Sequence, residues 1–180
     1  MFTDSSILGR VAHGLARWMA IAGGIALLAM IAIVVISVIG RTLIWAGLKP
    51  ILGDYELIGL GMGFAVFAFM PWAHLERGHA LVSLVTDNFS DAVNAWILVV
   101  TDLMMLVAAA FIAWRLYFGM MDKFSYRETT ILLGVPMGWA YAVALIGAVA
   151  FVLVALFVFG RSVTDALAGR APARQLGAEH

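Results

Sequence analysis

Four long apolar stretches, separated by shorter polar segments, set the pattern of this chain. Residues 18–40, 57–73 and 135–160 contain no charged side chain, and residues 92–114 have a similar length and contain one, Asp102. A bilayer core about 30 Å thick requires about 20 apolar residues in an α-helix. The pattern therefore predicts an all-α integral membrane protein with four transmembrane helices.

The third stretch can be placed in two registers. Shifting it to 103–121 removes Asp102 from the span and brings in Arg115 instead. A longer, tilted helix from about residue 91 to 121 would place these two side chains near opposite interfaces, because a helix longer than the bilayer is thick tilts to fit it. The sequence leaves the register open.

Composition supports a membrane protein and excludes several other classes. The chain is 64% hydrophobic and 12% charged, against roughly 45–50% and 25% in soluble domains. A domain of 180 residues cannot bury that much apolar surface in one core. The formal net charge is zero, which gives no basic field for nucleic acid, and cysteine is absent, which excludes disulfides and thiolate metal sites.

The segments outside the spans are expected to be amphipathic or mobile. Residues 41–56 and 115–134 mix apolar, aromatic and charged side chains, so we expect interfacial segments there, with Trp45 at headgroup depth. Residues 1–17 form an N-terminal cytoplasmic segment in this interpretation, and residues 161–180 form a mobile C-terminal tail.

Four spans place both termini on one side of the membrane. Six basic residues fall on the side of the termini and five on the other, a small bias that favours cytoplasmic termini. The first span is longer than the apolar region of a signal peptide and ends at Arg41 without a small-residue cleavage site. We therefore expect an uncleaved first helix.

Two histidines close together, His74 and His79, flank Glu76 and raise the question of a metal site. On a helix they would be five residues apart, whereas the helical zinc pattern places its two histidines four apart. No cysteine or acidic cluster nearby completes a ligand set. The preferred interpretation is that the apolar helix ends at Trp72 and that His74 lies in water or among headgroups.

Asp102 and the glycines Gly59 and Gly63 are the residues whose placement in a membrane needs a reason. A charge at the bilayer centre costs about 2.5–3.5 kcal/mol on insertion scales. Asp102 could lie near the headgroups, accept a hydrogen bond from a neighbouring span, form an ion or proton site, or contact a partner protein. Gly59 and Gly63 form a small-xxx-small pair, which allows close helix packing either within this chain or against a second membrane protein.

Three segments together resemble a known family. They read "PILGDYELIGLGMGF" before the second span, "HLERGHALVSLV" after it, and "YRETTILLGVPMGWAYAVALIGAV" at the start of the last. In order and spacing they are similar to the small membrane subunit of TRAP transporters (tripartite ATP-independent periplasmic transporters), the DctQ-like family. The matching positions are Glu56, His79, Pro136, Trp139 and Tyr141.

The resemblance extends from about residue 10 to 165 and departs from the family at one motif. The acidic motif of the family is often a Glu-Glu pair, and here it reads Asp54-Tyr55-Glu56. Any role that needs two adjacent acids is therefore not carried over to this chain.

The resemblance implies an accessory subunit of a bacterial inner-membrane transporter. It would pair with a large permease subunit that carries the substrate and sodium sites, and would extend the fixed scaffold of an elevator-type machine. A periplasmic binding protein would deliver small organic acids. The chain itself would hold no cofactor and catalyse no reaction, and its sequence shows no nucleophile with a base and no phosphate loop.

The candidate contacts implied by this interpretation fall into three groups. Contacts with the large subunit are expected at Asp102, Gly59, Gly63 and Glu56. Contacts with the binding protein are expected at Lys123, Arg127 and Glu128. Interfacial anchors are expected at Trp45, His79, Trp139 and Tyr141.

Two other functions remain open at this point. One is a haem- or metal-anchoring membrane subunit of an enzyme complex. The other is a small transporter that works alone as a homodimer, although four continuous spans leave little room for the discontinuous helices that commonly form a midplane substrate site.

Overall fold

The computed structural model describes residues 6–76 and 91–168, and nearly all of this part of the chain is helical. Its four long helices are α1 (Ile7–Thr42), α2 (Asp54–Leu75), α4 (Asp91–Ser125) and α5 (Met137–Leu167). Each is long and apolar enough to cross a membrane. The predicted all-α architecture with four transmembrane helices is confirmed.

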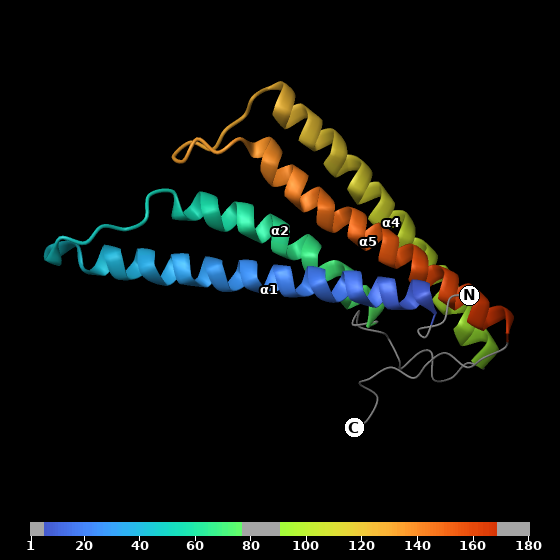
Figure 1. Ribbon diagram of the computed structural model, residues 1–180. Helices are drawn as coiled ribbons and strands as arrows, with labels where there is room; N and C mark the ends of the chain where they lie inside the picture. Colours follow the sequence, from blue (N-terminus) through green and yellow to red (C-terminus); the bar gives the residue numbers. More distant parts are fainter. Residues whose placement is uncertain (1–5, 77–90, 169–180) are drawn as a thin grey trace.

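The helices lie in a row and open like a fan (Figure 1). The order across the row is α1, α2, α5, α4, and neighbours in the row pack against each other; α1 also contacts α5, where the helices converge. The helices converge where α1 begins and α5 ends, which we call the terminal end. They diverge toward the connections 43–53 and 126–136, which we call the loop end.

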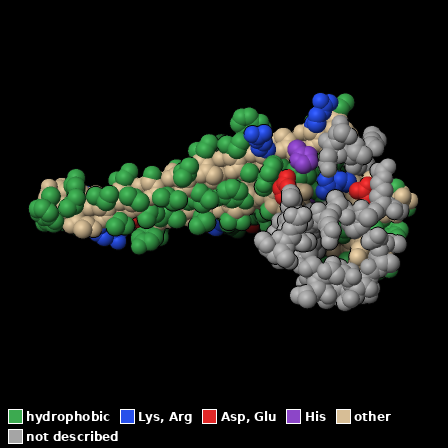
Figure 2. Space-filling view, turned by 90° about the horizontal axis from the view of Figure 1, so that it is seen from below, with side chains coloured by type: hydrophobic (Ala, Val, Ile, Leu, Met, Phe, Trp, Pro, Cys, Tyr) green, Lys and Arg blue, Asp and Glu red, His purple; other side chains and the backbone are tan. Residues whose placement is uncertain are grey.

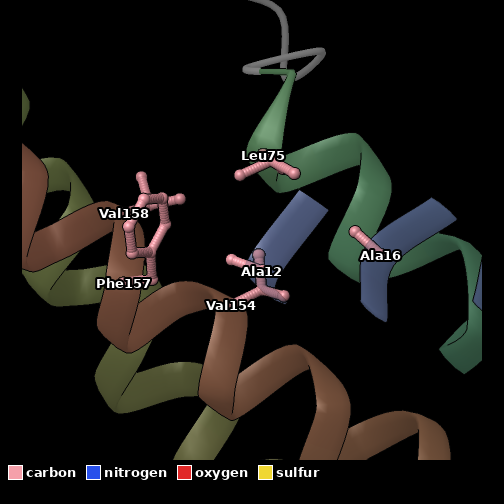
Figure 3. Packing of buried hydrophobic residues seen from close by; sticks show 6 residues of the cluster. All are labelled: Ala12, Ala16, Leu75, Val154, Phe157 and Val158. Atoms are coloured by element: carbon pink, nitrogen blue, oxygen red, sulfur yellow. The ribbon is translucent and has the colours of Figure 1, made fainter. Parts of the chain in front are cut away.

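Small residues bring the helices together at the terminal end. Figure 3 shows Ala12 and Ala16 of α1 and Leu75 of α2 around the α5 side chains, and the full cluster is Ala12, Ala16, Leu75, Val154, Phe157 and Val158. Because lipid removes the hydrophobic drive between helices in a membrane, such contacts depend on close van der Waals packing. α5 is the most enclosed helix, with half of its most apolar window buried.

The outer surface is apolar over most of its length. On the face shown in Figure 2, hydrophobic side chains cover the shaft of the molecule, and charged and histidine side chains gather near its terminal end. Large side chains such as Trp18, Leu28 and Met104 are each about 70% exposed. A soluble monomer rarely exposes so continuous an apolar surface, so it is consistent with contact with lipid.

The helices extend beyond the apolar spans that the sequence predicts. α1 begins at Ile7, inside the expected N-terminal segment, and α5 continues through Leu167, where a mobile tail was expected. The extension of α5 has a physical reason, since Ser162 is buried and hydrogen-bonded to Asp102 of α4.

The expected interfacial segments are correspondingly shorter. Residues 115–125 belong to α4, which runs unbroken from Asp91 to Ser125 and so contains both Asp102 and Arg115. Its length agrees with the longer helix among the registers considered, and the tilt of that helix stays a prediction. Only residues 43–53 and 126–136 remain as connections at the loop end, and the first of these contains the short helix η1 (Ile44–Ala46).

A polar contact ties α1 to α2 at the loop end. The Ser37 hydroxyl donates to Asp54 Oδ2 at 2.6 Å, and the Arg41 guanidinium lies 3.4 Å from the same oxygen. The connection folds back closely, because a Cβ added at Gly40 would lie 2.4 Å from the carbonyl oxygen of Lys49. Ser37 is almost fully buried, so its hydroxyl has found the partner that a buried polar group needs.

We expect Ser37→Ala to weaken this end of the structure. Asp54 would lose its closest side-chain donor, and the loss of one net hydrogen bond in a chain of this size lowers the melting temperature by about 2–4 °C. Thr42→Ala is the matched control, because the Thr42 hydroxyl bonds only to Val38 O one turn back in its own helix. Thermal unfolding in detergent measures both variants, and equal melting temperatures would contradict the assigned role of Ser37.

Candidate functional site

A groove opens between α2 and α5 at the loop end and brings together several of the residues singled out above. Its volume is about 620 Å³. Residues of α2, α5 and the connection 126–136 line it, and Leu116 of α4 also contributes. The lining residues are Glu56, Gly59, Leu60, Gly63, Phe67, Leu116, Glu128, Thr129, Thr130, Ile131, Met137, Ala140, Tyr141 and Ala144.

The connection 126–136, which we call the hairpin, is a compact, internally bonded unit. It starts with a Schellman-type cap on α4, in which the Arg127 amide donates to Phe124 O and the Glu128 amide to Lys123 O, each at 3.2 Å. Arg127 has φ 51°, a left-handed conformation in which glycine is favoured. The chain then doubles back, and the Thr130 amide donates to Val135 O at 2.9 Å.

Glu56 fixes the hairpin to the beginning of α2. Its two carboxylate oxygens accept from the backbone amides of Leu132 and Leu133 at 2.8 and 2.9 Å. The Leu133 side chain packs over Gly53, where an added Cβ would lie 2.6 Å from Leu133 Cγ. A charged acceptor makes stronger hydrogen bonds than a neutral one, so this bidentate contact positions the wall of the groove.

The two acids at the start of α2 have separate partners. Asp54 contacts Ser37 and Arg41 of α1, whereas Glu56 holds the hairpin before α5. The sequence has Asp54 and Glu56 where the family often has a Glu-Glu pair. The structure is consistent with this difference, because the two acids bond to different neighbours and do not act side by side.

Gly59 and Gly63 face open space. Apart from its own helix backbone, a Cβ added at either would meet no atom of the described residues within 4 Å, whereas one at Gly61 between them would lie 2.5 Å from Met30 Sδ of α1. Of the two packing options considered for Gly59 and Gly63, close packing within the described part of the chain is therefore not what the structure shows. Their face is open to another molecule.

The groove ends where the backbones of α2 and α5 approach each other closely. A Cβ added at Gly147 of α5 would lie 2.9 Å from the carbonyl carbon of Phe67 of α2. The helices thus touch at this level, and the groove widens from there toward the hairpin.

The three candidate contacts with a binding protein differ in whether they belong to the Lys123–Glu128 ion pair. Lys123 and Glu128 form an ion pair with each other, so their charges largely cancel. Arg127, between them on the exposed turn, is not part of that pair. Contact with a binding protein stays a prediction at all three positions, and Arg127 is the strongest of them.

Asp102 is buried inside the bundle near the terminal end, far along α4 from the hairpin. It is 5% exposed and accepts a hydrogen bond from the hydroxyl of Ser162 of α5. Hydrogen bonding to a neighbouring span was one of the alternatives for this residue, and it is the one that the structure contains. Contact between Asp102 and a partner subunit stays a prediction.

The expectation that His74 lies in water or headgroups is wrong. His74 is 3% exposed, and its ring meets Phe151 of α5 edge-on, with centroids 5.8 Å apart. α2 continues past Trp72 to Leu75. His74 is therefore still part of the helix, and its imidazole packs against α5. His79 lies outside the described residues, and within them no group of three or more His, Cys, Asp or Glu side chains could hold a metal ion.

The other expected anchors occupy the loop end. Trp45 is 83% exposed on η1, and Trp139 is 63% exposed at the start of α5, in edge-on contact with Phe124. Tyr141 is half-buried, and it lies against Gly119 of α4, where an added Cβ would come within 2.9 Å of its ring. Their positions are compatible with a membrane interface, a role that stays a prediction.

The sequence did not predict the partners of two hydroxyl groups that join helices, Ser37 and Ser162. Ser37 could have been found, because its hydroxyl stands alone in the first span and such a group needs a partner in lipid. Ser162 carried no signal, since it follows the last apolar span in sequence and looks like part of a solvated tail.

The hairpin contact gives one prediction. Glu56→Gln replaces a two-oxygen acceptor by an amide whose NH₂ group cannot accept, so the Leu132 and Leu133 amides lose at least one partner. We expect these amides to exchange hydrogen about ten-fold faster, while amides inside α5 keep their protection. Glu128→Gln is the control on the hairpin itself. Unchanged exchange in Glu56→Gln would contradict this role.

The glycines give a second prediction. Gly63→Leu should leave the fold and melting temperature nearly unchanged, because the new side chain enters open space. Gly147→Leu should destabilise strongly, since overpacking typically costs 1–3 kcal/mol or more. Helicity and thermal unfolding of the two variants, compared side by side, test the assignment; equal loss in both would show that Gly63 packs inside the fold.

Comparison with known proteins identifies the family. Residues 30–165 match the family described as tripartite ATP-independent periplasmic transporters, DctQ component. Neither the curated proteins nor the solved structures that were compared give a match. The match covers well over half of the chain, including all of α2, all of α4 and the hairpin to which Glu56 bonds. The family is described as a transporter component and not as an enzyme. The chain belongs to the DctQ component family of the tripartite ATP-independent periplasmic transporters.

Proposed function

We propose that this chain is the scaffold subunit of a TRAP-type transporter in the bacterial inner membrane. It pairs with a large permease subunit and receives no substrate itself, while a periplasmic binding protein delivers small organic acids for sodium-driven uptake. The observation that carries the proposal is the family match over residues 30–165, in a chain whose four helices are all able to cross the membrane.

The shape of the chain supports a scaffold role. The helices form a row in which α5 packs against α2 and α4, and the polar contacts of Asp54 and Glu56 fix both connections at the loop end. A subunit braced in this way presents a wide apolar face that a larger membrane protein can cover. The open face around Gly59 and Gly63 is the part of this surface that we assign to the large subunit.

The loop end is the side that we assign to the binding protein. It carries exposed Arg127 next to the Lys123–Glu128 pair, and contacts through such charges weaken as salt increases. This assignment places the loop end in the periplasm and both termini in the cytoplasm. The coupling sodium and the substrate then bind in the large subunit.

The test is co-expression with a candidate large subunit encoded beside this chain, together with the binding protein of the same system. We expect the two membrane chains to purify together, and vesicles containing both to take up, with sodium and the binding protein, the acid that stabilises that binding protein. Vesicles with either membrane chain alone should show background uptake only.

One variant separates assembly from docking. Arg127→Glu should keep co-purification intact and lower uptake several-fold at low salt, because it reverses the charge of the proposed docking surface. Arg10→Glu, at the terminal end, is the matched control. Uptake by this chain alone, or full uptake without it, would refute the proposal, and unchanged uptake in Arg127→Glu would remove the docking assignment.

A further inference from the structure

The length of the groove corresponds to one leaflet of a bilayer. Along α2 it extends from Glu56 at the hairpin to Phe67, where Gly147 of α5 closes it. At 1.5 Å per residue this is about 16 Å. The hydrocarbon core of a bilayer is about 30 Å thick, so the groove reaches from the polar boundary to about the midplane.

The shape of the groove fits an acyl chain better than a helix. Leu116 of α4 also lines it, α2 and α5 approach closely at its inner end, and the residues Gly59, Gly63 and Ala140 of its walls are small. A transmembrane helix is about 10–12 Å across and crosses the whole bilayer, so only part of it could lie along a slot that ends halfway. A single lipid tail of one leaflet matches the full length of the slot.

The mouth of the groove is polar and acidic. Glu56 and Glu128 line it there, and Lys123 supplies one positive charge through its pair with Glu128. Lys123 and Arg127 lie nearby but are not among the residues that line the groove, so the charged side chains that line its mouth are both carboxylates. Such a mouth favours a headgroup that carries its own ammonium and disfavours a purely anionic one.

From this match of length, shape and charge, we infer that the groove binds one ethanolamine phospholipid. An acyl chain lies over Gly59 and Gly63, and the ammonium of the headgroup faces Glu56 and Glu128. The lipid fills the slot itself, beneath any protein that covers the face, so the inference does not depend on the proposed partners.

The test uses the full chain purified alone in detergent, without any partner. Native mass spectrometry measures binding of added palmitoyl-oleoyl phosphatidylethanolamine and, separately, of the phosphatidylglycerol with the same tails. We expect one phosphatidylethanolamine per chain, with phosphatidylglycerol bound about ten-fold less. Gly63→Leu should lower the bound fraction about ten-fold, because leucine fills the slot.

Matched variants make the result specific. Gly24→Leu is the control, since Gly24 lies on α1, away from the groove, and also has no atom within 4 Å of an added Cβ. Gly59→Leu repeats the groove test in case Gly63→Leu does not fold, as judged by helicity. Glu128→Lys should reverse the preference toward phosphatidylglycerol, since the mouth then carries net positive charge.

The outcomes separate the possibilities. Equal lipid binding in the wild type and both groove variants would overturn the site. Equal binding of the two lipids by the wild type would overturn the headgroup assignment. Binding of no lipid by the isolated chain would likewise overturn the inference.

Discussion

The rest of the structure depends on the close packing of α1, α2 and α5 at the terminal end. Lipid tails are as apolar as leucine, so helices in a membrane gain little from burying apolar surface and must associate through short contacts. Ala12 and Ala16 allow α1 to reach Val154 and Val158 of α5 there. The three helices meet closely at this end and diverge toward the loop end, which produces the fan and the groove.

Polar contacts hold the helices together at the loop end, whereas close packing of small residues holds them together at the terminal end. In the diverging part of the fan, Ser37 and Asp54 tie α1 to α2, and Glu56 ties α2 to the hairpin before α5. A hydrogen bond to an ionised acceptor is stronger than one to a neutral acceptor and can hold two elements at a distance that alanine packing cannot bridge. The fan is therefore fixed at both ends, although by different interactions.

The sequence predicts the membrane helices well and the site only in part. Hydropathy identifies the four helices because the bilayer imposes their length and composition. It cannot predict that helices continue past the lipid core, as α5 does where Ser162 meets Asp102, because that continuation depends on a contact sixty residues away. His74 was misplaced for the same reason, since the end of an apolar run does not reveal that a neighbouring helix covers the ring.

The three glycines of α2 have different environments that the sequence pattern does not distinguish. Gly59, Gly61 and Gly63 follow one another at every second position, and nothing in the sequence tells which of them packs inside the chain. The structure turns Gly61 toward Met30 and leaves the other two open, so a motif that reads as one helix-packing signal serves two surfaces. A scaffold in a membrane requires this division: one face must hold its own helices rigidly, while another stays free for the lipid or protein that it supports.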